Sequence, residues 1–195
     1  MLEHGSIEWH AARRRGIGSS DAPTIMGASP WKNILELYEE KIATETKHTD
    51  NWAMARGREL EPVARDLYEI EYGLEMPPKL VKHKRYDYFL ANLDGFNDEN
   101  NFGIEIKCPG KKDRDLALLG QVPGKYFPQL QWQMLVAGSP TWHYVSYAGT
   151  DKVTVVQVNA DKKYQRELEL RARLFWYYVR NRIRPNELYF GLNYG

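Results

Sequence analysis

The sequence predicts a mixed α/β fold with a central mixed β-sheet flanked by helices. Strand-like alternation of apolar and polar residues occupies two regions, about 79–108 and about 141–158. Helical spacing of apolar residues precedes, separates and follows these regions, over about 52–72, 124–137 and 160–182. We therefore expect helices to cover a sheet whose strands come from both regions.

Length and composition are those of a single domain over residues 1–195. The net charge of +1 gives no global preference for a nucleic-acid partner, so local charge must decide that question. Cys108 is the only cysteine, which excludes an internal disulfide or a cysteine-cluster metal site built from this chain alone. No apolar run approaches the roughly 18 residues that span a bilayer. We expect a cytoplasmic protein with no membrane partner.

The first fifty residues predict three short helices. One surrounds Trp9, and a glycine-broken turn follows in which Ser20 or Asp21 caps the next helix. The third covers about 30–43 and leads into a polar linker at 44–50.

The longest predicted helix covers about 52–72. Gly73 is a typical terminator, and Pro62 should kink the helix or start part of it. We expect the buried side of this helix to carry Val63, Leu67, Ile70 and Leu74.

Asp94 and the segment 105–107 form the strongest candidate site. Residues 88–94 predict a strand, 95–101 a turn and 103–108 a returning strand. Because strand side chains alternate, Glu105 and Lys107 share one face of the returning strand, and the apolar residues between them face the other way. A carboxylate at the end of one strand then faces a carboxylate and an ammonium group on its neighbour.

This arrangement suits hydrolysis of a phosphodiester, which needs an activated water and neutralisation of the leaving oxygen. Oxygen-ligated Mg²⁺ supplies both. Asp94 and Glu105 would hold the ion, and the backbone carbonyl of Ile106 would complete its ligands. Lys107 would orient or deprotonate the attacking water. Glu61 is the candidate ligand for a second ion, because the adjacent proline can aim its carboxylate into a cleft.

Structural explanations exist for each of these residues. Asp94-Gly95 is also an ordinary hairpin signal, and Glu105 with Lys107 can be a solvated salt pair. Glu61 can belong to a surface charge pattern. Only the order and separation of these residues favour a site.

The turn after the arginines is a candidate anion pocket. Backbone N–H groups at a helix start, the hydroxyl groups of Ser19 and Ser20, and a guanidinium group from Arg14 or Arg15 would bind a terminal phosphate. The alternative is an ordinary capped helix preceded by a basic surface run.

The second half of the chain contains several glutamines and aromatic residues whose roles the sequence does not decide. Gln131 faces away from Gln129 and Gln133 on a helix, so the three cannot share one role. The aromatic residues Trp132, Trp142, Trp176, Phe175, Tyr177 and Tyr178 favour the core or an interface over base stacking. Trp31 and Tyr38 remain undecided.

Five motifs occur in order along the chain. They are Arg14-Arg15-Gly16-Ile17-Gly18-Ser19-Ser20-Asp21, Gly57-Arg58-Glu59-Leu60-Glu61-Pro62, Leu93-Asp94-Gly95, Ile104-Glu105-Ile106-Lys107-Cys108-Pro109 and Gln129-Leu130-Gln131. In this order they resemble the YqaJ-like viral recombinases, which include the lambda-type exonucleases of the PD-(D/E)xK nuclease superfamily. The resemblance covers about residues 9 to 147.

The resemblance implies a restriction endonuclease-like core and a Mg²⁺-dependent 5′→3′ exonuclease that acts on double-stranded DNA ends. Two metal ions are implied, with Mn²⁺ as a substitute for Mg²⁺. The product would be a 3′ single strand for an annealing protein in phage-type recombination. The resemblance also implies a homotrimeric ring that threads the DNA.

Residue by residue, the resemblance assigns roles to most of the candidates. Asp94 and Glu105 match metal ligands, Lys107 the catalytic lysine, Glu61 the helix carboxylate and Gln131 the active-site glutamine. Arg14 with Ser20 matches the anchor of the 5′ phosphate, and Arg15 can take the place of Arg14. A structure-selective or nicking endonuclease, or a non-catalytic DNA-binding module, are the alternative functions.

Overall fold

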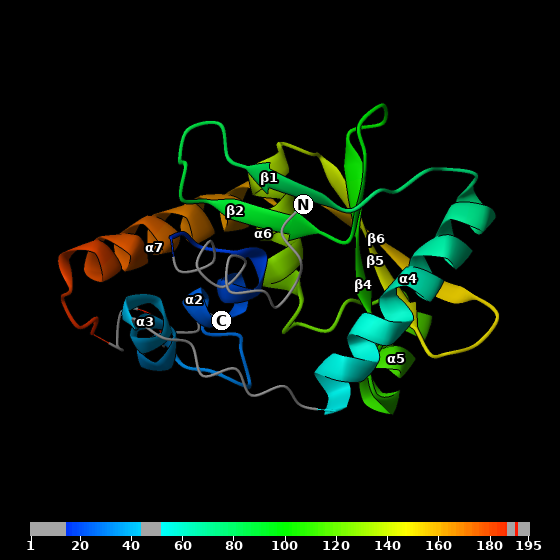
Figure 1. Ribbon diagram of the computed structural model, residues 1–195, viewed down its shortest axis with the longest axis horizontal. Helices are drawn as coiled ribbons and strands as arrows, with labels where there is room; N and C mark the ends of the chain where they lie inside the picture. Colours follow the sequence, from blue (N-terminus) through cyan, green and yellow to red (C-terminus); the bar gives the residue numbers. More distant parts are fainter. Residues whose placement is uncertain (1–14, 44–51, 187–189, 191–195) are drawn as a thin grey trace.

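A four-stranded mixed sheet lies at the centre of the part of the chain that the structure describes, residues 15–43, 52–186 and 190. This structure is a computed structural model. Two antiparallel pairs flank one parallel pair, so the predicted mixed sheet is confirmed (Figure 1). The strands, in their order across the sheet, are β3 (Gly95–Asn97), β4 (Phe102–Lys107), β5 (Thr141–Tyr147) and β6 (Val153–Asn159).

A separate hairpin of β1 (Lys79–Lys82) and β2 (Leu90–Leu93) precedes this sheet. The chain passes from the hairpin into the sheet at Asp94. The turn expected over residues 95–101 begins later than predicted, because Gly95–Asn97 forms a strand that pairs with β4. Gly95 permits this close passage, since a Cβ there would lie 2.8 Å from the Cβ of Met76.

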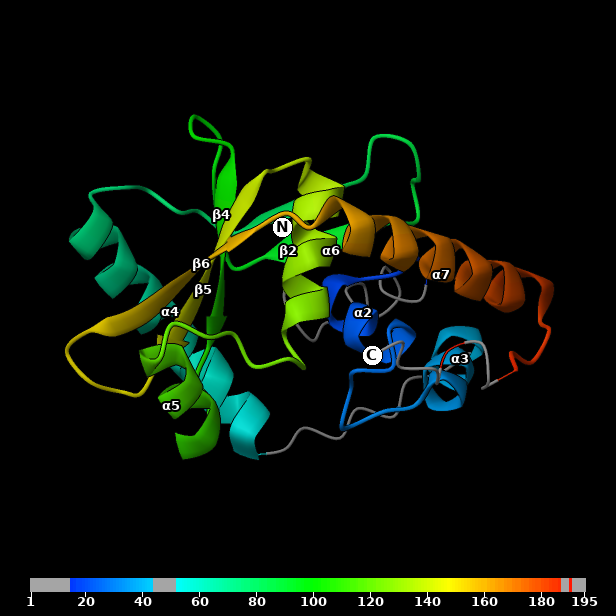
Figure 2. The same ribbon diagram turned by 180° about the vertical axis from the view of Figure 1, so that it is seen from behind.

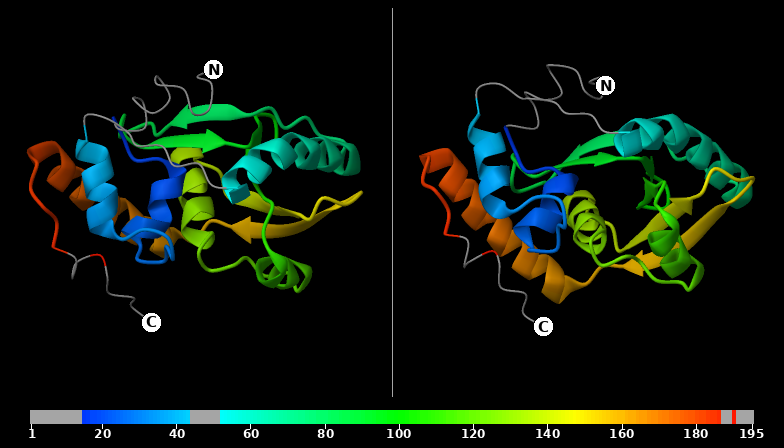
Figure 3. Two further views of the ribbon diagram at one scale, coloured as in Figure 1. Left: turned by 60° about the horizontal axis from the view of Figure 1, so that its bottom comes forward. Right: turned by 90° about the horizontal axis from the view of Figure 1, so that it is seen from below.

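Helices cover both faces of the four-stranded sheet. The helix α4 (Trp52–Tyr72) packs on the face that carries Ile104 and Ile106. The helices α5 (Lys111–Leu118) and α6 (Phe127–Ala137) pack on the other side, as Figures 2 and 3 show. The helix α5 is not among the predicted elements; it is highly charged and buries only Ala117.

The predicted buried side of α4 is right in part, since Leu67 and Leu74 pack against the core. Val63 and Ile70 are exposed, whereas Ala64 and Tyr68 are fully buried against the sheet. The Tyr68 hydroxyl group lies 2.7 Å from Nδ1 of His143 on β5, which fixes the rotation of the helix. The helix also continues through the proline that was expected to kink or start part of it.

The remaining helices form the larger core. They are η1 (Ser19–Asp21), α2 (Ala22–Ile25), α3 (Ile34–Ile42) and α7 (Lys162–Asn181). Three of them lie beside α6, and α3 packs against α2 and α7. Trp132, Trp142, Phe175 and Trp176 are buried as predicted, and Tyr38 joins them. Tyr177 and Trp31 are exposed.

Two predicted segments, the helix around Trp9 and the linker 44–50, lie outside the described residues. Among the described helices, none has the length and apolar character needed to cross a membrane.

Candidate functional site

Asp94 occupies the point where the chain leaves the hairpin and enters the central sheet. Its Oδ2 accepts a hydrogen bond from the N–H of Ile106 at 2.8 Å. Its backbone carbonyl accepts another from Nε of Arg65 on α4 at 2.6 Å. The side chain and main chain of Asp94 are therefore both held in place.

Glu105, a residue of β4, lies beside Asp94 and is almost fully buried. Its Oε1 accepts hydrogen bonds from Nζ of Lys107 and, at 2.6 Å, from Nε2 of Gln129. Its Oε2 accepts a hydrogen bond from Nε2 of Gln133. Buried carboxylates need such donors, because burial without them is costly. The predicted shared face of Glu105 and Lys107 is confirmed by this ion pair.

Negative charge is concentrated at this point of the fold. Burial raises the pKa of Asp94 well above its usual range, and the charges of Glu105 and Glu61 raise it further. For Lys107 burial favours the neutral amine, but attraction by Glu105 and Asp94 outweighs it and raises the pKa. Lys107 is therefore a charged ammonium group at neutral pH in this arrangement.

The expected position of Gln131 at this centre is wrong. Its Nε2 donates to the carbonyl of Asn159 at 2.9 Å, and its Oε1 accepts from the N–H of Asp161 at 2.9 Å. Gln131 thus joins α6 to the end of β6 and the start of α7. Gln129 and Gln133, one helical turn apart, face Glu105 instead.

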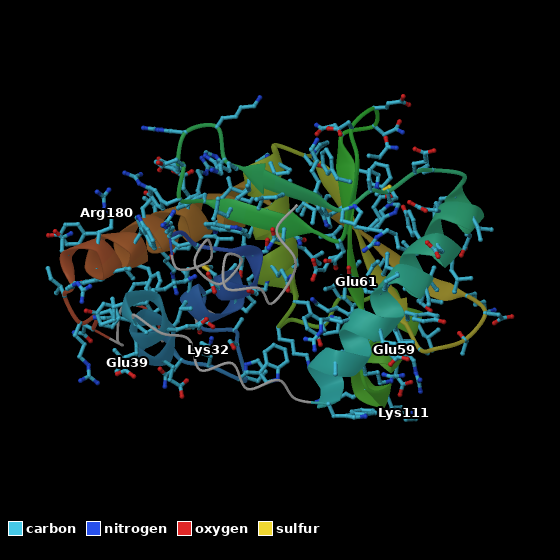
Figure 4. The ribbon with its side chains drawn as sticks, viewed as in Figure 1. Lys32, Glu39, Glu59, Glu61, Lys111 and Arg180 are labelled. Carbon is cyan, nitrogen blue, oxygen red and sulfur yellow. The ribbon has the colours of Figure 1, made fainter. Side chains whose placement is uncertain are left out.

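Glu61 reaches the centre from α4. Its Oε1 lies 2.7 Å from a guanidinium nitrogen of Arg65, four residues further along the helix. Burial raises the pKa of Glu61, and the charge of Arg65 opposes that rise. Figure 4 shows Glu61 on the part of α4 that lies beside the strands. The role of Arg65 is not among the predictions from sequence, although its spacing of four residues from Glu61 is a usable signal.

The donor chemistry of Asp94, Glu105 and Glu61 suits a hard divalent ion. Carboxylate oxygens are the ligands that Mg²⁺ prefers, and a cation would relieve the repulsion that raises the pKa of Asp94. Within the described part of the chain, the side chains as they stand form no group of three or more metal-binding residues. Donors from the protein itself occupy the oxygens of Glu105 here.

The predicted anion pocket lies at the turn that enters η1. Arg14 falls outside the described residues, and Arg15 and Ser20 are exposed. The hydroxyl group of Ser19 is buried and has no hydrogen-bond partner among the described residues. This turn packs against α6, the helix that carries the two glutamines facing Glu105.

A buried ion pair fixes the same turn. Oδ2 of Asp21 accepts hydrogen bonds from the N–H of Gly18 at 2.8 Å and from Nζ of Lys41 at 2.6 Å. Both side chains of the ion pair are only 2% exposed.

Several known proteins are similar to this chain in sequence. The sequence model of the YqaJ-like viral recombinase domain matches residues 8–140. The uncharacterized protein YqaJ of Bacillus subtilis (strain 168) is 29% identical over 134 residues, which cover 67% of this chain and 42% of that protein. Protein D345L of African swine fever virus (strain Badajoz 1971 Vero-adapted) is 34% identical over 65 residues, 33% of this chain and 19% of that protein. The chain thus matches less than half of the length of these relatives.

Solved structures share the fold. An alkaline exonuclease from Laribacter hongkongensis, LHK-Exo, is 28% identical, with a TM-score of 0.78 and coverage of 91% of this chain and 94% of that one. LHK-Exo has also been solved in complex with dAMP, with a TM-score of 0.77 at the same identity and coverage. A phage related exonuclease from Haemophilus somnus 129PT is 14% identical, with a TM-score of 0.63 and coverage of 86% and 95%, and supports the fold alone. The PD-(D/E)xK core that the sequence predicts is confirmed.

Proposed function

Because the chain belongs to the YqaJ-like viral recombinase family and has the fold of an alkaline exonuclease, we propose that it is a Mg²⁺-dependent 5′→3′ exonuclease. It would degrade one strand of double-stranded DNA from an end and leave a 3′ single strand. The observation that supports this best is the group formed by the buried Glu105 and the half-buried Asp94 and Lys107, held by donors from β4, α6 and α4.

Asp94, Glu105 and Glu61 would hold one or two Mg²⁺ ions, with Mn²⁺ as a substitute and the carbonyl of Ile106 as a further ligand. Such ions polarise the phosphate and lower the pKa of bound water. The charges of Glu105 and Glu61 both act on Asp94, which supports a shared site for these carboxylates.

The other residues act on the substrate or on the carboxylates. The ammonium group of Lys107 neutralises charge on the scissile phosphate and orients water with its hydrogens. Gln129 and Gln133 keep the carboxylate of Glu105 in a fixed orientation. The turn with Ser19 and Ser20, together with Arg14 or Arg15, would receive the terminal 5′ phosphate and so set the polarity.

Mononucleotides are the proposed products. LHK-Exo, which shares this fold, binds dAMP, a mononucleotide with a 5′ phosphate. By the family resemblance we extend the proposal to a homotrimeric ring around DNA and to an annealing protein as partner. A bacterial or phage-infected cytoplasm and a single nuclease domain over 1–195 belong to the same proposal.

The decisive experiment uses a linear duplex labelled at its 5′ or 3′ ends and a covalently closed circle of the same sequence, each with Mg²⁺. We expect early release of the 5′ label as mononucleotide, late release of the 3′ label and an intact circle. Cleavage of the closed circle would instead establish an endonuclease. Binding without cleavage of any substrate would establish a non-catalytic DNA-binding module.

Two variants assign the reaction to this centre. Lys107→Ala and Asp94→Ala should abolish cleavage while binding of duplex ends largely survives. Lys163→Ala, which removes an exposed lysine near the start of α7, is the matched control and should cleave normally. Full activity in either variant of the centre would contradict the assignment.

A further inference from the structure

Trp31 is a large aromatic side chain that the core does not use. It lies in the loop between α2 and α3 and is 63% exposed, whereas Trp132 and Trp142 are fully buried. Aromatic side chains supply much of the energy of binding sites when they are exposed in a fixed position. Burial in the core explains the positions of Trp132 and Trp142, whereas the exposed position of Trp31 needs a functional explanation.

Contacts on both sides hold Trp31 in place. Oγ of Ser29 accepts hydrogen bonds from the N–H groups of Trp31 and Lys32, each at 3.2 Å. The indole ring stacks on Tyr126 with 6.1 Å between ring centroids and 29° between planes. The ammonium group of Lys125 lies 5.1 Å from the centroid of each ring. A ring fixed in this way loses little freedom when a ligand binds.

Tyr126 connects this platform to the proposed nuclease centre. Nζ of Lys107 lies 5.6 Å from the centroid of the Tyr126 ring. Lys125 is itself positioned by an ion pair with Asp113 of α5, with 2.6 Å between Nζ and Oδ2. Trp31, Tyr126 and Lys107 thus form a continuous row from an exposed ring to the reacting groups.

Space for a ligand adjoins the exposed ring. An open surface cavity of about 460 Å³ lies between the end of α2 and the start of α3, and Trp31 forms part of its wall with Ser29 and Asn33, whereas Tyr126 and Lys125 do not line it. Sites for small ligands have volumes of about 300–1,000 Å³. Figure 4 shows Lys32, the next residue in this loop, on the side of the molecule formed by α2 and α3.

We propose that Trp31, Tyr126 and Lys125 form a stacking site for the base of the 5′-terminal nucleotide. The chemistry suits a nucleobase, because aromatic rings stack on bases of any sequence and a cation strengthens the contact. The proposal rests on the proposed function. The turn at Gly18–Ser20, proposed to receive the 5′ phosphate, leads into η1, which packs against α6, and Tyr126 is the N-cap of α6 and lies next to Lys107.

The test compares two 5′-phosphorylated duplexes, one with a normal terminal nucleotide and one in which that nucleotide lacks its base. For the unaltered enzyme we expect release of the first nucleotide to be about tenfold to a hundredfold slower without the base, because one stacked base contributes about 1–3 kcal/mol. Trp31→Ala should slow the normal end to the rate of the abasic end. Trp31→Phe should restore most of the difference.

Tyr177→Ala is the matched control, since Tyr177 is an exposed aromatic residue on α7 with 56% exposure. It should leave the ratio of the two rates unchanged. Equal slowing of both ends by Trp31→Ala, with an unchanged melting temperature, would overturn the stacking site. So would a ratio near one in the unaltered enzyme.

A binding measurement separates failure of this site from failure of the proposed function. Calorimetry with Mg²⁺ compares dAMP with deoxyribose 5-phosphate, which has the same phosphate and sugar without the base. Stronger binding of dAMP that Trp31→Ala removes would support the site even if the chain proved to have another polarity or no activity. Equal binding of the two compounds would overturn it while leaving the exonuclease proposal intact.

Discussion

Glu105 has an environment unlike that of an ordinary carboxylate on a strand. It is 1% exposed and receives hydrogen bonds from Lys107, Gln129 and Gln133. Replacement of a buried charged network by apolar residues is often neutral or favourable for stability, so stability alone does not account for it. The arrangement is better explained by a need to present a fixed carboxylate.

At the scale of single residues, the sequence predicts part of the site. Alternation along a strand places Glu105 and Lys107 on one face, and the structure confirms it. Helical geometry separates Gln131 from Gln129 and Gln133, but it leaves the rotation of the helix on the sheet undetermined. That rotation depends on packing across α6 and α7, which a single segment of sequence does not contain.

The glutamines give the first prediction. Gln133→Ala should lower kcat about tenfold to a hundredfold, because Glu105 loses a buried donor worth about 1.5–3 kcal/mol. Gln131→Ala is the matched comparison. It should leave kcat nearly unchanged and lower the free energy of unfolding by about 1–3 kcal/mol, since two backbone groups lose their partner. A larger loss of kcat in Gln131→Ala than in Gln133→Ala would contradict these roles.

Asp94 gives the second prediction. Its pKa is raised in the folded protein, so the folded state binds the proton more tightly than the unfolded state. The stability of the metal-free protein should therefore fall as pH rises from about 4, where an unperturbed aspartate ionises. Asp94→Asn removes this effect and keeps an acceptor for the N–H of Ile106.

Thermal unfolding in a chelator checks this prediction. Asp94→Asn should melt higher than the unaltered protein at pH 7 to 8, and the difference should shrink toward pH 4. Mg²⁺ should raise the melting temperature of the unaltered protein more than that of the variant. A variant that melts lower at pH 7 and responds fully to Mg²⁺ would contradict the role of Asp94.

The arginines give the third prediction. Arg14→Ala with Arg15 intact should reduce cleavage of 5′-phosphorylated ends about tenfold to a hundredfold, as expected for loss of a hydrogen bond to a charged group. Ends with a 5′ hydroxyl group should lose less. The reciprocal variant, Arg15→Ala, identifies the anchor if it alone shows this selectivity. Equal losses on both kinds of end in both variants would argue against a phosphate anchor.

Among the elements, the passage from β2 to β3 matters most for the site. The carboxylate of Asp94 can reach Ile106 only because β3 begins immediately after it and pairs with β4. The sequence signals a hairpin at Asp94-Gly95, but strand periodicity does not say which strands pair. The same limit explains why α4 is predicted with the right length and a buried side that is only partly right.

Gly95 gives the fourth prediction. A Cβ at this position would lie 2.8 Å from both the Cβ and the carbonyl oxygen of Met76, so Gly95→Ala must displace backbone. We expect a loss of about 1–3 kcal/mol in the free energy of unfolding, as for other overpacked cores, together with reduced kcat. Gly57→Ala in α4 is the control, because no atom lies within 4 Å of a Cβ there, and it should stabilise the protein. A Gly95→Ala protein with unchanged stability would contradict the tight passage.

At the scale of the whole molecule, the sequence predicts the α/β architecture well, because long periodic segments alternate with strands. The helices of about 52–72 and 160–182 are observed at Trp52–Tyr72 and Lys162–Asn181. The short, charged α5 is the element that pattern alone does not reveal. The elements that approach the proposed nuclease centre come from distant parts of the chain. For this reason, the set of motifs in order predicts the site better than any single motif does.

The donors around Glu105 have a practical consequence for enzymology. Because the protein itself holds this carboxylate through Lys107, Gln129 and Gln133, the fold does not depend on a bound ion to keep it in place. We expect the enzyme to remain folded in a chelator and to assemble on DNA ends without reacting. Addition of excess Mg²⁺ would then start every complex at once, so that the first turnover could be followed in a rapid-mixing experiment.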